Sequence, residues 1–414
     1  MAYSQGSLLR NNTFTYQYLA TSIGNENIKP ETKYEFELGI ENKFFNNRLG
    51  MEFNFYSNTI KDQILDVTSA ASMGAKSMLM NVGELANKGI ELNVYGTPIQ
   101  NKDWQWDLRA NVAWNKNTVK KLADGLDVLT HGDPVDNGGD AAVLESHVGE
   151  SMGDWYAYTW KTDDKGNYIV GENGLYITDT SERKKVGNAM PKVTGGFGTS
   201  LSYKNWTLDA AFDFRFGGDV LNTPWQYYMS VGNIEDAVGV RDASTGGVYY
   251  YSDTEDISNK GSIHVVSPDQ ISNYKRGETM INGHYVWDNG VILPGVKEDG
   301  TPNDIVVTQF EANDNHYGWG TSATQSYADA VQKNSYIKCR EISLAYTLPK
   351  QLTQKFACTR LQLSAFVRNP FYIYRTLKLF DSETSDGTNW IYQAQVGGST
   401  ASARTFGFSL RASF

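Results

Sequence analysis

Hydrophobic and polar residues alternate strictly along residues 404–414. One face carries aromatic and aliphatic side chains, which are Phe406, Phe408, Leu410, Ala412 and Phe414. The opposite face carries small or polar residues, which are Thr405, Gly407, Ser409, Arg411 and Ser413. A period of two predicts a β-strand with one apolar and one polar face. About eleven residues is also the length that a tilted strand needs to cross the hydrocarbon core of a bilayer.

The same alternation recurs along the chain, and we count about ten such strands. Further stretches with this pattern run over 34–44, 49–56, 90–94, 104–115, 193–203, 206–216, 336–348 and 361–369, with a weaker one over 13–20. The alternation within 336–348 changes phase near Glu341. A short strand or strand pair is also predicted around 155–160, whereas 217–334 shows no sustained period.

The connections between these strands alternate between short and long. Short connections lie near Asn46, Pro98, Asn205 and Pro349, and long ones near Met73, Asp133, Asp253 and Asp386. Outer-membrane barrels have short periplasmic turns, long extracellular loops and aromatic girdles at both membrane interfaces. Trp104 and Trp114, at the two ends of one apolar face, fit such girdles. The pattern therefore predicts an all-β protein, a portion of an antiparallel transmembrane β-barrel whose last strand descends to the periplasm.

Composition agrees with this prediction and excludes some other classes. The 414 residues include 25 Tyr, 18 Phe and 10 Trp, yet the mean hydropathy is −0.46, as expected when apolar faces are hidden by alternation. No run of about twenty apolar residues predicts a transmembrane helix. The net charge of −10 argues against nucleic acid as a partner. A large soluble all-β protein has a similar composition and stays an alternative at this point.

Candidate chemistry is sparse. Cys339 is expected in a strand and Cys358 near a turn, too far apart for a disulfide. The histidines are all expected in loops without metal-ligand spacing, and they are His131, His147, His264, His284 and His316. The acidic residues of 299–304 lack the spacing of a calcium loop. We therefore expect no catalytic residues, no metal and no cofactor, and the chain is not expected to be an enzyme.

Loop aromatic residues are the candidates for ligand binding, because aromatic rings beside polar groups suit sugar rings and peptide side chains. They are Trp155, Tyr156, Trp160, Trp225, Tyr227, Tyr228, Trp319 and Trp390. For each of them, packing within a loop or a place in a membrane girdle is the alternative.

Several stretches resemble, in the same order, the SusC/RagA family of TonB-dependent outer-membrane transporters. They read NIKPET (27–32), FFNNRLG (44–50), KDQIL (61–65), NVGELANKGIEL (81–92), YIKCREISLAYTLP (336–349) and RTFGFSLRASF (404–414). The last stretch resembles the terminal strand and outer-membrane assembly signal of that family. The resemblance assigns four side chains to this signal, namely Phe406, Phe408, Leu410 and Phe414.

The resemblance covers only the C-terminal part of the family. Residues 1–414 are expected to form the C-terminal part of a receptor barrel, with the leader, the TonB-contacting segment, the plug domain and the N-terminal strands absent. Barrels of this kind have about 22 strands. About ten strands cannot close such a barrel, so we expect an open, curved sheet.

The resemblance also implies a function at the outer membrane. It implies import of nutrient oligomers, either glycan or peptide fragments, with a SusD-like lipoprotein over the extracellular face and energy from the TonB system through the missing N-terminal part. The alternative is a non-transporting surface β-protein that binds glycans or host proteins through its aromatic loops. A third alternative, a soluble β-enzyme, requires the apolar strand faces to be buried in a core.

Overall fold

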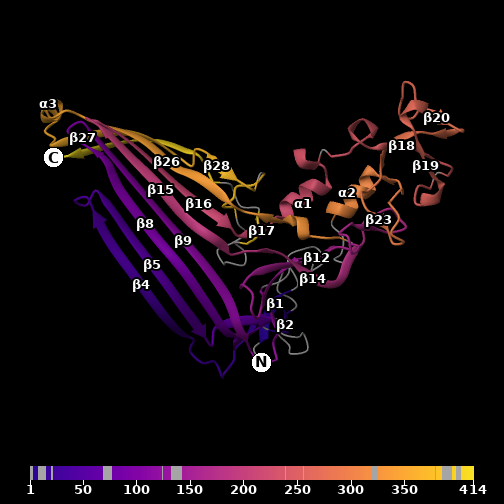
Figure 1. Ribbon diagram of the computed structural model, residues 1–414, viewed down its shortest axis with the longest axis horizontal. Coiled ribbons are helices and arrows are strands. Elements are labelled where there is room, and N and C mark those ends of the chain that lie inside the picture. Colours follow the sequence, from indigo (N-terminus) through magenta and orange to yellow (C-terminus); the bar gives the residue numbers. More distant parts are fainter. Residues whose placement is uncertain are drawn as a thin grey trace.

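The computed structural model describes most of the chain, namely residues 3–7, 15–19, 22–68, 77–123, 125–131, 142–237, 239–254, 256–318, 325–377, 379–384, 394–397 and 402–414. Figure 1 shows a long curved sheet on one side and a group of short strands and helices on the other. We call the ten-stranded sheet the wall. The described residues of 123–190, 217–335 and 376–404, which lie at one end of the sheet, are called the loop lobe.

The wall is antiparallel, and its strands follow the order β29-β27-β26-β16-β15-β9-β8-β5-β4. Their bounds are β4 (Thr32–Phe44), β5 (Leu49–Lys61), β8 (Gly83–Gln100), β9 (Trp104–Leu122), β15 (Pro191–Tyr203), β16 (Trp206–Gly217), β26 (Tyr336–Thr347), β27 (Arg360–Arg368) and β29 (Thr405–Ser413). A tenth strand, β28 (Tyr372–Arg375), also pairs with β26. Strands β4 and β29 form the two edges. The open sheet is confirmed, and so is the count of about ten strands, although the tenth strand is β28 from the predicted loop after 369 and the stretch 13–20 lies outside the wall.

The register of the wall joins the apolar faces of successive strands into one surface. Phe53 of β5 pairs with Ile40 of β4 and with Leu92 of β8, and Leu92 pairs with Val112 of β9. This surface is open even in the middle of the wall, where Leu208 is 42% exposed. An exposed apolar surface of this extent is what a lipid-facing barrel wall presents. The alternative of a soluble enzyme required these faces to be buried in a core, whereas they are exposed.

A row of aromatic side chains crosses the apolar face near the short turns. Tyr203 pairs with Trp104 on one side and with Trp206 on the other, and Trp206 pairs with Tyr346. The ring centroids of Trp104 and Tyr203 lie 4.3 Å apart, and those of Trp206 and Tyr346 lie 4.7 Å apart. Such a row marks a membrane interface, here at the end where the hairpin turns lie.

The wall strands are longer than the apolar pattern predicts. β8 begins at Gly83 instead of residue 90 and continues through Gln100, so the predicted turn near Pro98 is wrong and the turn occupies 101–103. β9 likewise continues to Leu122. Main-chain pairing carries both strands past the apolar band, where the side chains are polar or mixed. The long connection after β5 also contains two further strands, β6 (Ile64–Thr68) and β7 (Ser77–Asn81).

The four short turns and the C-terminus lie at the opposite end of the wall from the loop lobe, with α3 (Lys350–Thr353) in the last of these turns (Figure 1). The last strand therefore descends toward the short-turn end, as predicted. Near the lobe end lie β1 (Tyr3–Ser7) and β2 (Thr15–Leu19), which pair with each other, and β3 (Ser22–Ile23), which pairs with β7. Among the described residues, no helix is long and apolar enough to cross a membrane.

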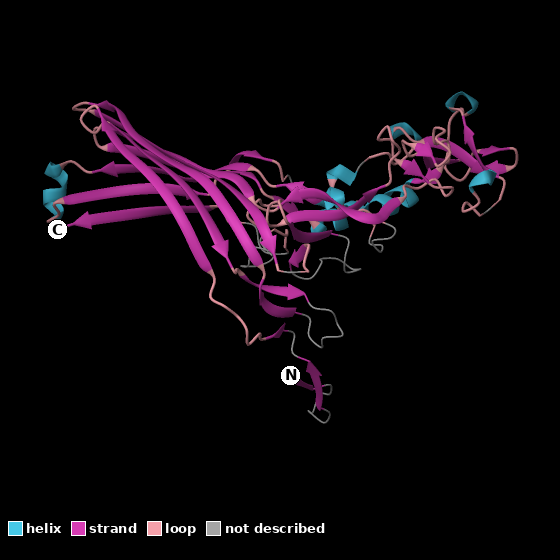
Figure 2. Ribbon diagram, turned by 60° about the horizontal axis from the view of Figure 1, so that its bottom comes forward, coloured by secondary structure: helices cyan, strands magenta, loops and turns pink. Residues whose placement is uncertain are grey.

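The loop lobe is folded instead of irregular (Figure 2). One four-stranded sheet comprises β10 (Val128–His131), β11 (Ala142–His147), β12 (Asp154–Trp160) and β14 (Thr178–Asn188). A second comprises β18 (Val248–Ser252), β19 (Ile263–Val266), β22 (Trp287–Val291) and β24 (Val307–Thr308). The helices are α1 (Thr223–Ser230) and α2 (Gln309–Tyr317), and the remaining short strands are β13 (Ile169–Val170), β17 (Asp219–Leu221), β20 (Met280–Ile281), β21 (His284–Tyr285), β23 (Val296–Lys297) and β25 (Val331–Lys333).

Residues that are far apart in the sequence share one hydrophobic core in the lobe. Leu144, Trp155, Leu221, Tyr327 and Ala394 are buried together there. Main-chain hydrogen bonds connect the same segments, since the amide of Leu221 donates to the carbonyl of Ala394 at 2.9 Å. Segments of three long connections are therefore packed together near one end of the wall.

Candidate functional site

The loop lobe meets the polar face of the wall at a bulge in β26. Cys339 pairs with Phe212 of β16 and Glu341 pairs with Ala211, so Arg340 is an extra residue without a partner on β16. This bulge is the phase change that the sequence predicts near Glu341. A bulge re-aims side chains and increases the local twist of the strand. Here two basic side chains on either side of Cys339, Lys338 and Arg340, both pair with the carboxylate of Glu383.

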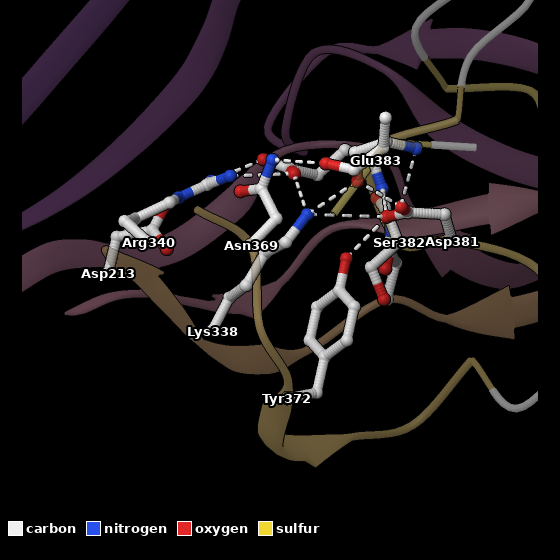
Figure 3. Close-up of polar contacts among 11 residues, drawn as sticks. Asp213, Lys338, Arg340, Asn369, Tyr372, Asp381, Ser382 and Glu383 are labelled. Atoms are coloured by element: carbon white, nitrogen blue, oxygen red, sulfur yellow. Dashed lines mark hydrogen bonds and ion pairs between the residues drawn. The ribbon is translucent and has the colours of Figure 1, made fainter. Parts of the chain in front are cut away.

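Lys338 and Arg340 connect the wall to the segment 381–383 of the last long loop (Figure 3). Lys338 is 2% exposed; its Nζ forms an ion pair with Glu383 and lies 3.7 Å from the Asp381 Oδ1 atom. Arg340 donates from Nη1 to Glu383 Oε2 at 2.7 Å and also pairs with Asp213 of β16. We call these five residues the anchor network.

Hydrogen bonds keep the loop carboxylates of the anchor network ionised. Burial acts to raise the pKa of Asp381, but hydrogen bonds from Ser402 and Tyr372 lower that pKa to about 2. Burial also acts to raise the pKa of Glu383, but the hydrogen bonds and charges of Arg340 and Lys338 hold that pKa below its usual value. At neutral pH both carboxylates are therefore anionic and paired. These charge pairs join the last long loop to the wall.

Two of the predicted ligand-binding aromatic residues lie inside the lobe. Trp155 is 1% exposed, and its Nε1 atom donates to the main-chain oxygen of Asp219 at 3.1 Å. Trp160 is 5% exposed and packs against Tyr176 and His316, with ring centroids 5.6 Å and 5.5 Å away. Since neither ring is open to a ligand, we assign both tryptophans to the packing of the lobe.

Four other predicted residues are more accessible. Tyr227 and Tyr228 of α1 are 49% and 38% exposed. Trp225 is half-buried with its ring edge-on to Tyr317, and Tyr156 is half-buried and stacked on His147. The ring centroids of Tyr227 and Tyr228 on α1 lie 5.9 Å apart, whereas Tyr156 lies in β12. The role of these four side chains in binding stays a prediction.

Some predictions fall outside the described residues or need correction. Trp319 and Trp390 lie outside the described residues. The prediction that all five histidines lie in loops is wrong. They occupy regular elements because the lobe is folded, with His131 in β10, His147 in β11, His264 in β19, His284 in β21 and His316 in α2. Within the described part of the chain, no group of three or more His, Cys, Asp or Glu side chains is placed to hold a metal ion.

The thiols and the last strand lie where the sequence places them. Cys339 lies in β26 and Cys358 follows the turn after α3; both are buried, and they do not form a disulfide with each other. Phe406, Phe408 and Leu410 of β29 continue the apolar face of β27, and Phe414 is exposed at the short-turn end. This position is compatible with the assembly signal implied by the resemblance, whose role stays a prediction.

The anchor network was missed at the sequence level. Asp213 and Glu383 are 170 positions apart in the chain, and nothing in the local pattern connects them. The sequence signal for this network is the change of phase near Glu341. The charged residues Lys338 and Arg340 come just before it in an otherwise amphipathic strand. A bulge at such a place identifies a wall position where a loop can attach.

An apolar outer face, a polar inner face and folded loops at one end define a wall segment of a membrane β-barrel. The family model described as TonB dependent receptor-like, beta-barrel matches residues 2–254. The chain therefore belongs to the TonB-dependent receptor β-barrel family, and within that family it is similar to SusC in sequence and to the RagAB peptide transporter in fold. Proteins of this family are outer-membrane proteins, and this chain is one as well.

Individual relatives agree with this assignment. TonB-dependent receptor P3 of Formosa agariphila is 30% identical over 223 residues, which cover 49% of this chain and 22% of the relative. TonB-dependent receptor SusC of Bacteroides thetaiotaomicron is 28% identical over 217 residues, which cover 50% of this chain and 21% of the relative. The solved structure of the RagAB peptide transporter matches with a TM-score of 0.60 at 19% identity, over 100% of this chain and 38% of that one. The chain thus spans only between about a fifth and two fifths of these relatives.

Proposed function

We propose that residues 1–414 form the C-terminal part of the barrel of a TonB-dependent importer of nutrient oligomers. In this proposal the wall supplies about half of the barrel circumference, since about 22 strands close such a barrel. The loop lobe supplies part of the extracellular ligand-binding surface. The plug and the segment that contacts the TonB system belong to the part of the receptor that precedes these strands.

One observation carries this proposal. Segments of three long connections share a core, and the last of these connections attaches to the polar face of the wall through the anchor network. A folded loop lobe at the extracellular end of the barrel is suited to bind a ligand before the ligand enters the lumen. The outward-facing tyrosines of α1, Tyr227 and Tyr228, offer stacking surfaces for sugar rings or peptide side chains.

The proposed ligands are glycan or peptide fragments, and the proposed partner is a SusD-like lipoprotein that covers the lobe. The fold similarity to the RagAB peptide transporter supports a two-component arrangement. The similarity to SusC supports the same class of importer. Transport in this scheme requires no bond chemistry from the chain, and the energy comes from the TonB system.

Energy-dependent uptake tests the proposal. Cells that produce the full-length receptor would be given fluorescent glycan oligomers and peptides, with or without a protonophore that removes the energy source of TonB. We expect uptake of one ligand class that a protonophore abolishes, while binding at the cell surface remains. A tagged receptor should also retain a lipoprotein from the same outer membrane, whereas an unrelated tagged barrel should not.

The alternative is a surface β-protein that binds glycans or host proteins without translocating them. The aromatic side chains on α1 are suited to bind a ligand in either case. They therefore do not distinguish an importer from a surface protein that only binds. Surface binding that is unaffected by the protonophore, with no accumulation inside the cell, would support the alternative and contradict the importer.

A further inference from the structure

The apolar face of the wall contains a groove with a volume of about 880 Å³ near the short-turn end. Its apolar lining includes Leu49, Val94, Leu108, Ala110 and Phe197, which belong to four neighbouring strands. The register places these residues on the lipid-facing side, since Ala110 pairs with Val94 and with Phe197. The groove therefore opens toward the bilayer and not toward the lumen.

Small residues and an irregular register create the groove. Gly96 lies opposite both Leu49 and Leu108, and the pairing of β8 with β9 shifts between Gly96 and Ile99. Missing side-chain volume at Gly96 and Ala110 leaves a depression between the larger residues on either side. The indole Nε1 of Trp106 donates to the Thr199 hydroxyl at 2.8 Å. Because these two polar groups hydrogen-bond to each other, the floor of the groove presents an apolar surface to a ligand.

A fixed positive charge stands at one end of this groove. Arg48, in the turn between β4 and β5, lines the groove and is exposed. Its guanidinium donates to the main-chain oxygen of Thr97 from Nε at 3.2 Å and from Nη2 at 3.0 Å, and to that of Pro98 at 2.8 Å. A guanidinium carries five N–H donors, and these contacts involve only Nε and Nη2. Within the described residues, no carboxylate forms an ion pair with Arg48, so its charge is available to an anion.

We propose that this groove and Arg48 form a binding site for one glycerophospholipid. An acyl chain occupies the apolar groove, and the phosphate of the head group pairs with Arg48. Guanidinium groups bind phosphate through parallel, charge-assisted hydrogen bonds. The short-turn end of an outer-membrane barrel faces the periplasm, and the leaflet on that side consists of glycerophospholipids. The site therefore selects a lipid that carries both an acyl chain and a phosphate.

Native mass spectrometry of the purified full-length receptor in detergent tests this site. The probes are phosphatidylethanolamine, diacylglycerol with the same acyl chains, and inorganic phosphate. We expect one phosphatidylethanolamine to bind above the background of surrounding lipid, while diacylglycerol binds more weakly and inorganic phosphate does not bind detectably. Equal binding of diacylglycerol and phosphatidylethanolamine would show that the phosphate is not recognised and would overturn the proposal.

Two variants remove the two halves of the site separately. Arg48→Gln removes the charge, and we expect phosphatidylethanolamine to bind about fivefold more weakly, the effect of one basic residue near a lipid surface. Ala110→Phe fills the groove and leaves Arg48 in place, and we expect the bound lipid to be lost. Arg48→Lys keeps the charge and should retain most of the binding.

Matched controls separate this site from unspecific lipid contact. Lys102→Gln removes a positive charge in the neighbouring turn, and Ala365→Phe enlarges an exposed residue of the same face on β27, away from the groove. Both controls should bind the lipid as the wild type does. Equal loss in the controls, or undiminished binding in folded Arg48→Gln and Ala110→Phe proteins, would contradict the site. Circular dichroism checks that each variant has kept its β-structure.

Discussion

The wall and the loop lobe obtain their stability in opposite ways. In the wall, large apolar side chains such as Leu208 and Leu344 stay open to the surroundings, and the polar side chains face the concave side. In the lobe, Trp155 and Tyr327 are enclosed by segments from three different loops. The wall therefore requires lipid as its apolar environment, whereas the lobe builds a core of the kind found in water-soluble domains.

This difference explains how one chain serves two environments. The wall strands pair mainly with their neighbours in the sheet, and their two faces are set by alternation. The shared core of the lobe depends on partners distant in the chain, such as Leu221 and Ala394, which are 173 positions apart. The anchor network is the place where the two kinds of structure are joined.

Removal of one cation from the anchor network has the largest expected effect. Lys338→Met leaves Asp381 and Glu383 short of one partner in a buried setting, and breaking a buried ion pair costs about 3–5 kcal/mol. We expect faster hydrogen–deuterium exchange in 379–384 and lower resistance to denaturant. Lys333→Met, at an exposed position of β25, is the control and should change stability by less than about 0.5 kcal/mol. Unchanged exchange in 379–384 would mean that the loop is held by other contacts.

Charge on the two faces of the wall should separate lipid contact from lumen contact. Leu92 and Asn93 are adjacent in the middle of β8 and point to opposite faces. Leu92→Arg is expected to destabilise the protein in lipid by about 2–4 kcal/mol, the cost of an arginine on the lipid face near the bilayer midplane. Asn93→Arg places the charge beside Glu52 on the polar face and should be nearly neutral. Urea unfolding in lipid vesicles measures both, and equal losses would contradict the assignment of the faces.

Acid should loosen the lobe before it affects the wall. Burial lowers the pKa of His131 in β10 to about 4, below the usual value of 6.5 for histidine. The unfolded lobe therefore binds a proton at higher pH than the folded lobe does. The stability contributed by neutral His131 is fully present above pH 6.5 and is lost as the pH falls toward 4. Between pH 7 and pH 5 the expected loss is about 2 kcal/mol.

Hydrogen exchange in 128–147 as a function of pH measures this loss. In His131→Gln the pH dependence of hydrogen exchange between pH 7 and pH 5 should largely disappear, because the titrating imidazole is absent. His264→Gln, which removes an exposed imidazole in β19, should leave the dependence unchanged. If wild type and His131→Gln lose protection equally over this range, another group controls the acid response.

Substitution of the exposed tyrosines of α1 should have the smallest effect on stability. Tyr227→Ala and Tyr228→Ala remove side chains at the surface of the lobe, where substitutions usually change stability by less than about 0.5 kcal/mol. Loss of one stacking contact, about 0.5–1.5 kcal/mol, should still weaken ligand binding severalfold. Surface binding of the labelled ligands together with thermal unfolding checks both expectations. Normal ligand binding in the double variant would remove these residues from the proposed site.

The strands of the wall were predictable from the sequence, but the residues at which they begin and end were not. Alternation over 34–44 or 206–216 is a local signal, since successive side chains of a strand point to opposite faces. The extensions of β8 to Gly83 and of β9 to Leu122 gave no such signal, because their side chains are polar or mixed there. Main-chain pairing with a neighbouring strand determines where these strands end.

The candidate site was predictable only in part. Aromatic residues in long loops mark either ligand contacts or loop packing, and the sequence does not distinguish the two. Trp155 and Trp160 became core residues because segments distant in the sequence enclose them, whereas Tyr227 and Tyr228 stay open on a helix surface. The anchor network depended on the same long-range contacts.

The sequence alone determined the strand pattern, the two faces of each strand, the alternation of short and long connections and the family, because these depend on side chains close together in the chain. Only the tertiary structure decided which loop aromatic residues are buried, how Lys338 and Arg340 hold the last loop, and where a groove lies beside Arg48. Each of these features needs residues from several strands or loops at one place. Register, bulges and missing side-chain volume bring those residues together, and none of these is visible in a single stretch of sequence.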